Sequence, residues 1–192
     1  MKNYLNYINE NVNQLDELIK KCIEENCYKA LSVLDKEYAM KVILDNFPSL
    51  LKINFKELIK YNFPLNIKNK NGYIALILSS VNKIENVKLL IDTGADLNIK
   101  NNNGSTALIC TTWNNNIKIA KLLINAGADI NIKDDDGCTA LMISSINNFI
   151  EIAKLLIDAG ADINIKDNKG NTALFYANKN NYTGIIELLK SN

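Results

Sequence analysis

Three aspartates run directly into a glycine at residues 134–137, inside the stretch NIKDDDGCTALMISS. Carboxylates that precede a glycine are typical of the helix-flanked loop that binds calcium through oxygen ligands. With Gly137 at the glycine position of such a loop, its first and last ligand positions would fall on Ile132 and Ile143. Neither side chain can bind a cation. We therefore predict a structural turn here and no metal site.

The chemistry open to the chain is narrow because its 192 residues contain no histidine. Histidine is the commonest general base, the usual partner of a serine or cysteine nucleophile, and a favoured zinc ligand. Serine pairs such as Ser144–Ser145 have no base beside them in the sequence. We predict no catalytic residue, no cofactor and no enzymatic activity. The four cysteines form no CxxC pair and are expected to be reduced thiols; they are Cys22, Cys27, Cys110 and Cys138.

Charge and hydrophobicity point to a folded protein without a strong electrostatic field. Lysine and arginine total 22, aspartate and glutamate total 21, and 47% of the residues are hydrophobic. This balance predicts neither nucleic-acid binding nor membrane binding. The N-terminal residues MKNYLNYINENVNQ lack the apolar core of a signal peptide, and no stretch is apolar enough for a membrane span. A cytoplasmic protein is expected, although a secretion signal of the kind used by bacterial effectors stays open.

The aspartate-containing stretch is one of four copies. The others are NIKNKNGYIALILSS from Asn66, NIKNNNGSTALICTT from Asn98 and NIKDNKGNTALFYAN from Asn164. Their turn glycines are Gly72, Gly104, Gly137 and Gly170, which are 32, 33 and 33 residues apart. A period this regular predicts stacked supersecondary units. The acidic run becomes NNN or NKN in other copies, so the acids are variable decorations of a shared turn.

Each copy predicts two short helices. Threonines that can accept a free backbone N–H mark the start of the first helix, and they are Thr106, Thr139 and Thr172. Asparagines that tolerate a left-handed conformation mark its end, and they are Asn115, Asn148 and Asn181. A second helix with apolar spacing follows. Glycines in GADLN or GADIN close it, and they are Gly94, Gly127 and Gly160.

The motifs G-x-T-A-L and LLI-x-x-G-A-D-[LI]-N, in this order and at this period, resemble the ankyrin repeat. The resemblance covers residues 54–192. It implies an all-α ankyrin-repeat solenoid of stacked helix-turn-helix units with short β-hairpin fingers. One degenerate half repeat, FKELIKYNFPLNIK, precedes units that start near residues 66, 98, 131 and 164, and the last unit acts as a C-terminal cap.

Departures from the ankyrin pattern mark individual units. The usual T-P-L-H reads T-A-L followed by Ile109, Met142 or Phe175, so the proline and the histidine are both missing. The first full copy also lacks the threonine and is one residue short between its helices. If the gap follows Asn82, Asn86 takes the place of Ile119. We expect this unit to pack most loosely.

Residues 1–53 show no clean repeat but read as helix. Apolar residues at i, i+3, i+4, i+7 and i+8 predict one amphipathic helix, and they are Leu15, Leu18, Ile19, Cys22 and Ile23. A second helix is predicted from Tyr28 to Phe47, ending before Pro48, with Leu31, Leu34, Ile43 and Leu44 on its buried side. The segment is either an N-terminal helical cap or degenerate repeats, or it carries a separate effector or toxin-like activity.

The resemblance implies a non-enzymatic interaction module or adaptor that binds another protein on its concave face. Carried over residue by residue, the contact positions are Tyr73, Val81, Trp113, Asn114, Asp135, Asp136, Cys138, Ile146, Asn147 and Lys179. Equivalent positions in three units hold Val81, Trp113 and Ile146, which predicts an apolar stripe. Trp113 either anchors a partner or packs on its own helices. As an anchor it would be flanked by Tyr73, Val81 and Ile146, with Asp134–Asp136 selecting a basic group at one edge. The resemblance does not distinguish these alternatives, and we expect a monomer.

Overall fold

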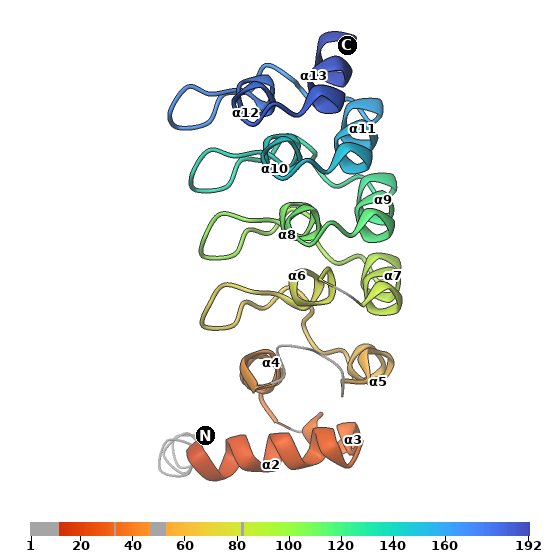
Figure 1. Ribbon diagram of the computed structural model, residues 1–192. Coiled ribbons are helices and arrows are strands. Elements are labelled where there is room, and N and C mark those ends of the chain that lie inside the picture. Colours follow the sequence, from red (N-terminus) through yellow and green to blue (C-terminus); the bar gives the residue numbers. More distant parts are fainter. Residues whose placement is uncertain (1–11, 33, 47–52, 82) are drawn as a thin grey trace. The chain divides into compact units, whose positions relative to one another are not determined.

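The computed structural model describes residues 12–32, 34–46, 53–81 and 83–192. All regular structure in these ranges is helical, and no residue in them belongs to a β-strand (Figure 1). The chain forms two compact units, Met1–Ala75 and Leu76–Asn192. The first contains α2 (Val12–Glu24), α3 (Tyr28–Leu31), α4 (Lys36–Asn46) and α5 (Phe55–Lys60). Helix α6 (Ala75–Ser79) begins at the boundary, and the second unit continues with α7 (Ile84–Asp92), α8 (Ala107–Trp113), α9 (Ile117–Asn125), α10 (Ala140–Ile146), α11 (Ile150–Asp158), α12 (Ala173–Lys179) and α13 (Thr183–Lys190).

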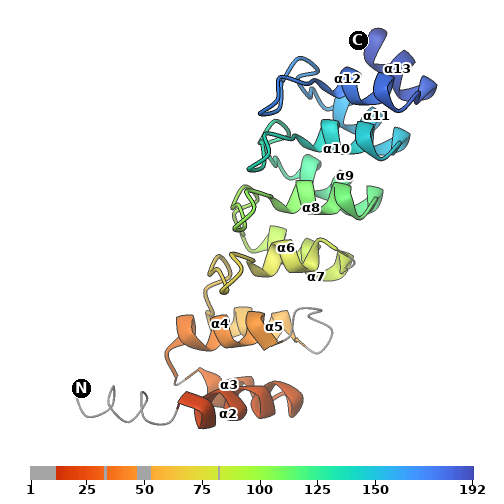
Figure 2. The same cartoon turned by 60° about the vertical axis from the view of Figure 1, so that its left-hand side comes forward.

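The helices of the second unit lie in two rows (Figures 1 and 2). Helices α8, α10 and α12 pack side by side in one row, and α7, α9, α11 and α13 pack in the other. Each pair joined by a turn also packs together, as α8 does with α9. Equivalent isoleucines in the second row, Ile119, Ile152 and Ile185, are completely buried. Burial of one such side chain contributes about 2 kcal/mol, so each helix pair is stabilised by its neighbours.

Threonine caps begin the first helix of the last three repeats, as predicted. The Oγ1 atoms of Thr106, Thr139 and Thr172 accept the N–H groups of Ile109, Met142 and Phe175 over 3.4, 3.3 and 3.3 Å. Each cap satisfies a backbone donor that has no partner within the helix. A cap of this kind contributes about 1 kcal/mol.

The predicted helix ends are confirmed by the backbone angles. Asn115, Asn148 and Asn181 have φ values of 51°, 59° and 57° after the first helices. Gly94, Gly127 and Gly160 have φ values of 79°, 89° and 91° after the second helices. Asn62, which stands where the later repeats have glycine, also has a positive φ of 56°. These left-handed residues turn the chain at both helix ends.

The fingers are tight turns built around one side-chain acceptor. In the second repeat the Oδ1 atom of Asn101 accepts the N–H groups of Asn103 and Ser105 over 2.9 and 3.0 Å. One backbone hydrogen bond, from Asn101 N–H to Ser105 O, closes the base at 2.9 Å. The same acceptor position is Asn69, Asp134 and Asp167 in the other repeats. The predicted β-hairpins are therefore hairpin-like turns without a strand ladder in the described residues.

Successive fingers of the second unit are joined by backbone hydrogen bonds. The N–H of Asp135 donates to Asn103 O, and the N–H of Asn168 donates to Asp136 O, both over 3.1 Å. Gly137 has a φ of 81°, and a Cβ atom placed on it would lie 2.6 Å from Asn168 N. The turn glycine is thus required by the left-handed backbone and by the close approach of the next finger.

Two tyrosine hydroxyls, one on a buried and one on a half-buried side chain, join segments of the first unit. Tyr28 is fully buried, and its hydroxyl oxygen accepts the N–H of Asn54 over 2.7 Å. The Tyr38 hydroxyl donates to Asp16 Oδ1 over 2.7 Å, and burial together with this bond raises the pKa of Tyr38 to about 12. These contacts join α4 to α2 and α3 to the start of α5.

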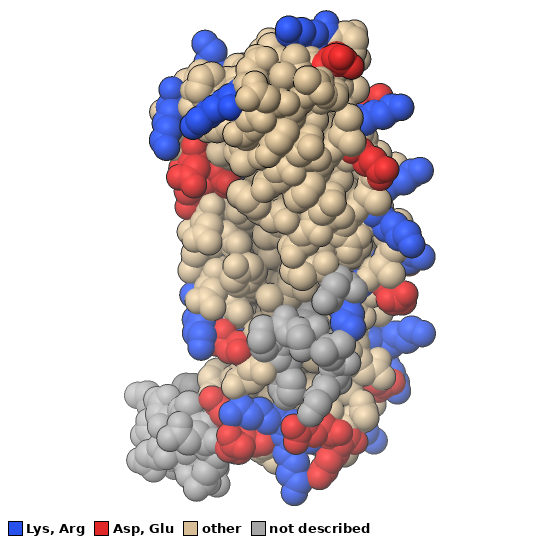
Figure 3. Space-filling model, viewed as in Figure 1, with Lys and Arg blue, Asp and Glu red and all other residues tan. Residues whose placement is uncertain are grey.

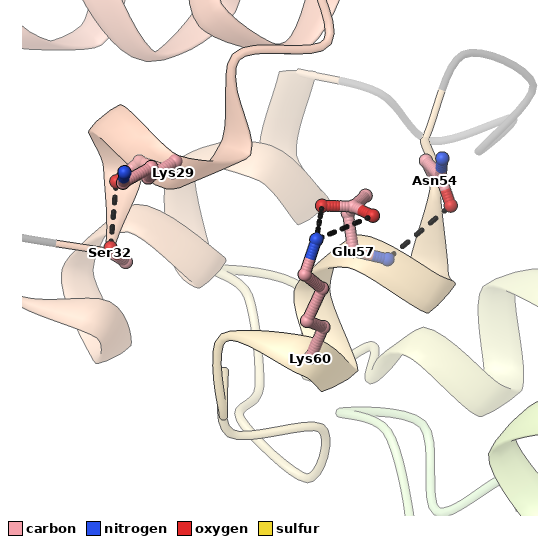
Figure 4. Close-up of polar contacts among 5 residues, drawn as sticks. All are labelled: Lys29, Ser32, Asn54, Glu57 and Lys60. Carbon is pink, nitrogen blue, oxygen red and sulfur yellow. Dashed lines mark hydrogen bonds and ion pairs between the residues drawn. The ribbon is translucent and has the colours of Figure 1, made fainter.

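Figure 4 shows how the short helices of the first unit begin and end. Asn54 caps α5, because its Oδ1 accepts the N–H of Glu57 over 3.4 Å. Lys60 Nζ lies 3.3 Å from the Glu57 carboxylate on the same helix. At the end of α3, Ser32 Oγ donates to Lys29 O over 2.7 Å. The Asn54 and Ser32 bonds satisfy free backbone groups at helix ends, whereas Lys60 and Glu57 form an ion pair between side chains.

Two predictions for the N-terminal segment were wrong. The single helix expected from Tyr28 to Phe47 is two helices, α3 and α4, because Asp35 Oδ1 accepts the N–H of Tyr38 over 2.9 Å and caps a new start. Leu18, expected on the buried face of α2, is 50% exposed. Ile19, Cys22, Ile23, Leu31, Ile43 and Leu44 are buried as predicted, while Leu34 is only half-buried. Phe47, Pro48 and the side chain of Leu15 lie outside the described part of the chain.

Helices α6 and α7 are the irregular pair, as their sequence predicted. Helix α6 spans five residues where α8 spans seven, and Ile74 replaces the capping threonine. Helix α7 begins 33 residues before α9, so Asn86 does stand at the position of Ile119. Asn86 is half-buried, whereas Ile119 is completely buried. The looser packing of this repeat stays a prediction.

Candidate functional site

The apolar stripe residues lie at one end of the first-row helices. Trp113 and Ile146 are the last residues of α8 and α10, which pack together, and Val81 lies two residues after α6. Trp113 is 50% exposed, Val81 is 39% exposed, and Ile146 is half-buried. Lys179 ends α12 at the equivalent position and is exposed. Neighbouring repeats are tied at this level by Asn116 Nδ2, which donates to Val81 O over 3.4 Å, and by Asn180 Nδ2, which donates to Ile146 O over 3.3 Å.

The two asparagines beside the stripe also complete the helices. Asn114 Nδ2 donates to Cys110 O over 2.7 Å, and Asn147 Nδ2 donates to Ile143 O over 2.9 Å. Both amides therefore satisfy carbonyls in the last turn of a helix. Each Nδ2 carries a second N–H, so a partner can contact either amide without breaking this bond.

The surface around Trp113 carries few charges. Residues 107–117 and 139–150, which form α8, α10 and the turns after them, contain no charged side chain. Figure 3 shows a broad uncharged area over these helices, with charged side chains gathered at the finger tips and along the second-row helices. Half-exposed tryptophan in such a surface is typical of a protein-binding site.

The acidic finger of the third repeat presents two of its three aspartates. Asp135 and Asp136 are exposed. Asp134 is half-buried, and its Oδ1 accepts the N–H groups of Asp136 and Cys138 over 3.1 and 2.8 Å. Burial raises the pKa of Asp134 above its ordinary value, although the two hydrogen bonds act to lower it. Asp134 thus holds the turn, and of the three aspartates only Asp135 and Asp136 are exposed.

Cys138 lies half-buried behind this finger. Burial, followed by the nearby Asp134 and Asp167 carboxylates, raises the pKa of its thiol to about 11. Burial raises the pKa of Cys110 to about 11 as well. Both thiols are protonated near neutral pH, so neither is an activated nucleophile.

The fourth finger contains a carboxylate that is charged and buried. Burial acts to raise the pKa of Asp167, but the Tyr176 hydroxyl and the N–H groups of Asn171 and Lys169 hold it at about 2. Asn171 N–H and Lys169 N–H donate to Asp167 Oδ1 over 2.8 and 2.9 Å. These hydrogen bonds stabilise the turn, and their donors all belong to the same repeat as Asp167.

Tyr73 was predicted to flank Trp113. It is half-buried in the first finger, where its N–H donates to Asn69 Oδ1 over 2.9 Å. Tyr73 belongs to the first compact unit and Trp113 to the second. Its place beside Trp113 therefore stays a prediction.

Two exposed apolar side chains were not singled out by the sequence. Ile150 at the start of α11 is 45% exposed, and Phe175 on α12 is 46% exposed. Ile150 fits the apolar spacing of its helix, so the sequence pattern predicts a buried side chain at this position. Phe175 aligns with the buried Ile109 and Met142, and only its position in the last repeat distinguishes it.

The paired helices, regular fingers and repeated caps define a helical repeat protein. A family model described as ankyrin repeats (3 copies) matches residues 49–134 and 129–192. The chain belongs to the ankyrin-repeat family, and its fold is the predicted all-α ankyrin-repeat solenoid. No curated protein matches the sequence. Ankyrin repeats are generally protein–protein interaction modules and are typically non-enzymatic.

In the described ranges, no three or more His, Cys, Asp or Glu side chains are grouped so that they could hold a metal ion. Of the helices that the structure describes, none is both long enough and apolar enough to cross a membrane.

Proposed function

We propose that the chain is a non-enzymatic adaptor that binds a partner protein on the concave face expected of an ankyrin stack. The observation that carries this proposal is the half-exposed Trp113 in an uncharged surface. A side chain of this size loses little conformational freedom on binding and is the residue type most enriched among binding hot spots.

The partner is expected to be apolar at its centre and basic at one edge. Trp113 and Val81 offer exposed apolar surface, while Asp135 and Asp136 offer exposed carboxylates on the finger of the next repeat. Lys179 ends the apolar row in the last repeat. The contact surface therefore centres on the second and third repeats. The remaining predicted contacts, Tyr73, Asn114, Asn147, Ile146 and Cys138, would surround this centre.

A matched pair of variants tests this site. Trp113→Ala should weaken partner binding by about 30-fold or more, which corresponds to about 2 kcal/mol. Ile150→Ala removes an equally exposed apolar side chain from α11 and should leave affinity within about threefold. The measurement is affinity capture with quantitative mass spectrometry, followed by titration of the captured partner. Unchanged affinity of Trp113→Ala, with a lower unfolding temperature, would show that Trp113 only packs on its own helices.

We further propose that residues 1–53 cap the repeats rather than carry a separate activity. Three contacts support this: Tyr28 with Asn54 at 2.7 Å, Leu44 O with Asn69 Nδ2 at 3.2 Å, and Asp45 Oδ1 with Lys70 N–H at 3.3 Å. They join the N-terminal helices to the first repeats inside one compact unit. Deletion of residues 1–53 should therefore abolish cooperative folding. A folded deletion variant that lost only its activity would support the effector alternative.

The proposal includes a cytoplasmic monomer. The cysteines of the described residues are free thiols, at positions 22, 27, 110 and 138, which suits a reducing compartment. Sedimentation at micromolar concentration and fractionation of the cells that make the protein would test both statements. A disulfide-linked or secreted form would contradict them.

A further inference from the structure

The same two hydrogen bonds recur between the second and third repeats and between the third and fourth repeats. Between the second and third repeats, Asp129 N–H donates to Asn98 Oδ1 over 2.9 Å and Asp135 N–H donates to Asn103 O over 3.1 Å. The third and fourth repeats use the same pair, Asp162 to Asn131 Oδ1 at 2.9 Å and Asn168 to Asp136 O at 3.1 Å. Each time the donors are six residues apart on one extended segment that ends in a finger.

A buried apolar side chain and a closely approached turn glycine recur in each of these repeats. Ile109 and Met142 are each 1% exposed on the first helix of a repeat that has another repeat after it. The turn glycine receives the next finger: a Cβ on Gly104 would lie 2.6 Å from Asp135 N. The groups that a repeat presents to its successor therefore include these two acceptors, the turn glycine and one apolar side chain.

The outer face of the fourth repeat presents the same four features uncovered. Gly170 has a φ of 83°, and a Cβ on it would meet nothing within 4 Å. Phe175, the counterpart of Ile109 and Met142, is 46% exposed. No described residue donates a hydrogen bond to Asn164 Oδ1 or to Lys169 O, the counterparts of the two acceptors.

A second copy of the chain does not supply the matching donor. The first finger would have to offer Lys70 N–H, the counterpart of Asp135 N–H and Asn168 N–H. That N–H donates to Asp45 Oδ1 over 3.3 Å within the first unit. Two outer faces placed together would also bring acceptor against acceptor and lysine against lysine.

The charge of the fourth repeat favours an acidic occupant. Residues 164–192 contain four lysines and two acids, and one of these acids, Asp167, is buried. Figure 3 shows more Lys than Asp or Glu side chains around α12 and α13. Exposed lysines attract a carboxylate-rich segment and repel a lysine-rich one.

We propose that Asn164, Lys169, Gly170 and Phe175 form a second docking surface, which binds an acidic extended segment of a partner protein that ends in a tight turn. Two backbone N–H groups six residues apart donate to Asn164 Oδ1 and Lys169 O. The turn covers Gly170, and an apolar side chain of the partner covers Phe175. This surface is separate from the one centred on Trp113, so either can fail without the other.

The probe is a fluorescein-labelled peptide that copies residues 128–160 of the chain. It carries six acids and two lysines, and its finger is the one that covers Gly104 in the folded protein. Fluorescence anisotropy should show saturable binding to the full chain. Phe175→Gln should weaken that binding at least tenfold, and Ile150→Gln, at a site of matched exposure, should change it less than twofold.

Three outcomes would overturn the proposal. They are the absence of saturable binding to the wild-type chain, equal weakening by both variants, and undiminished binding to Phe175→Gln. Sedimentation of the chain alone provides an independent check, because a dimer that Phe175→Gln disrupts would show a second copy on this face instead of a partner segment.

Discussion

Alanine at Gly137 and at Gly170 should cost different amounts of stability, because only one of these glycines has a finger packed against it. Both have nearly the same left-handed backbone, with φ values of 81° and 83°, so the conformational cost of alanine is about 1 to 2 kcal/mol at each. At Gly137 the new Cβ would also lie 2.5 Å from Asn168 Oδ1 and 2.6 Å from Asn168 N.

Relief of that clash must move the fourth finger away from the third. The movement breaks the bond from Asn168 N–H to Asp136 O and the bond from Asn168 Nδ2 to Asp135 O, which are 3.1 and 2.7 Å long. Each contributes about 1 kcal/mol. Gly137→Ala should therefore lower the free energy of unfolding by about 2 kcal/mol more than Gly170→Ala does.

Equilibrium unfolding in urea, followed by far-ultraviolet circular dichroism, measures this difference. Gly160→Ala is a further control, since its φ is 91° and nothing lies within 4 Å of the added Cβ. It should match Gly170→Ala. Equal losses for Gly137→Ala and Gly170→Ala would refute the conclusion that successive fingers pack against each other.

Three further predictions concern single side chains. Ser79→Ala should raise the free energy of unfolding by about 1 kcal/mol in urea titrations, because Ser79 Oγ is buried without a partner. Ser80→Ala should lower the free energy of unfolding by about as much, because Ser80 Oγ donates to Ile77 O over 2.6 Å. The charged form of Asp167 is favoured in the folded state, with a pKa of about 2, below its value of about 3.9 in an unfolded chain. The Asp167 carboxylate therefore stabilises the fold above pH 4 by about 1 kcal/mol after screening by water. This contribution to the free energy of unfolding disappears as the pH falls from 4 to 2. Urea titrations at several pH values should show that Asp167→Asn lacks it at every pH. Asn115 has a φ of 51°, so Asn115→Ala should lower the free energy of unfolding by about 1 kcal/mol, measured by thermal unfolding. Asn115→Gly should leave it almost unchanged.

The local elements of the fold could be predicted because each depends on neighbouring residues. A threonine three residues before a backbone donor defines a cap, and an asparagine or glycine defines a left-handed end, so Thr139 and Asn148 were enough to place α10. The period of 33 residues then implied stacking, and the family match confirmed it. The helix break before α4 does not follow from the apolar spacing, because it depends on the cap that Asp35 Oδ1 makes with Tyr38 N–H.

The candidate site was less predictable because exposure depends on what packs against a residue. Ile109, Met142 and Phe175 occupy one sequence position, yet only Phe175 is uncovered. Ile146 was expected in the same stripe as Trp113 but is half-buried. Asn114 and Asn147 stay predicted contacts, and one amide N–H of each donates to a helix carbonyl. Neighbours in space decide such details, and the repeat period does not encode them.

Trp113 is the only tryptophan of the chain, so its environment can be followed directly. Incorporation of 5-fluorotryptophan gives one ¹⁹F resonance, and the difference in its shift between H₂O and D₂O reports contact with water. The account predicts a clear isotope shift in the free protein that disappears when the partner captured with the wild-type chain is added. An isotope shift that persists at saturation would contradict partner binding at Trp113.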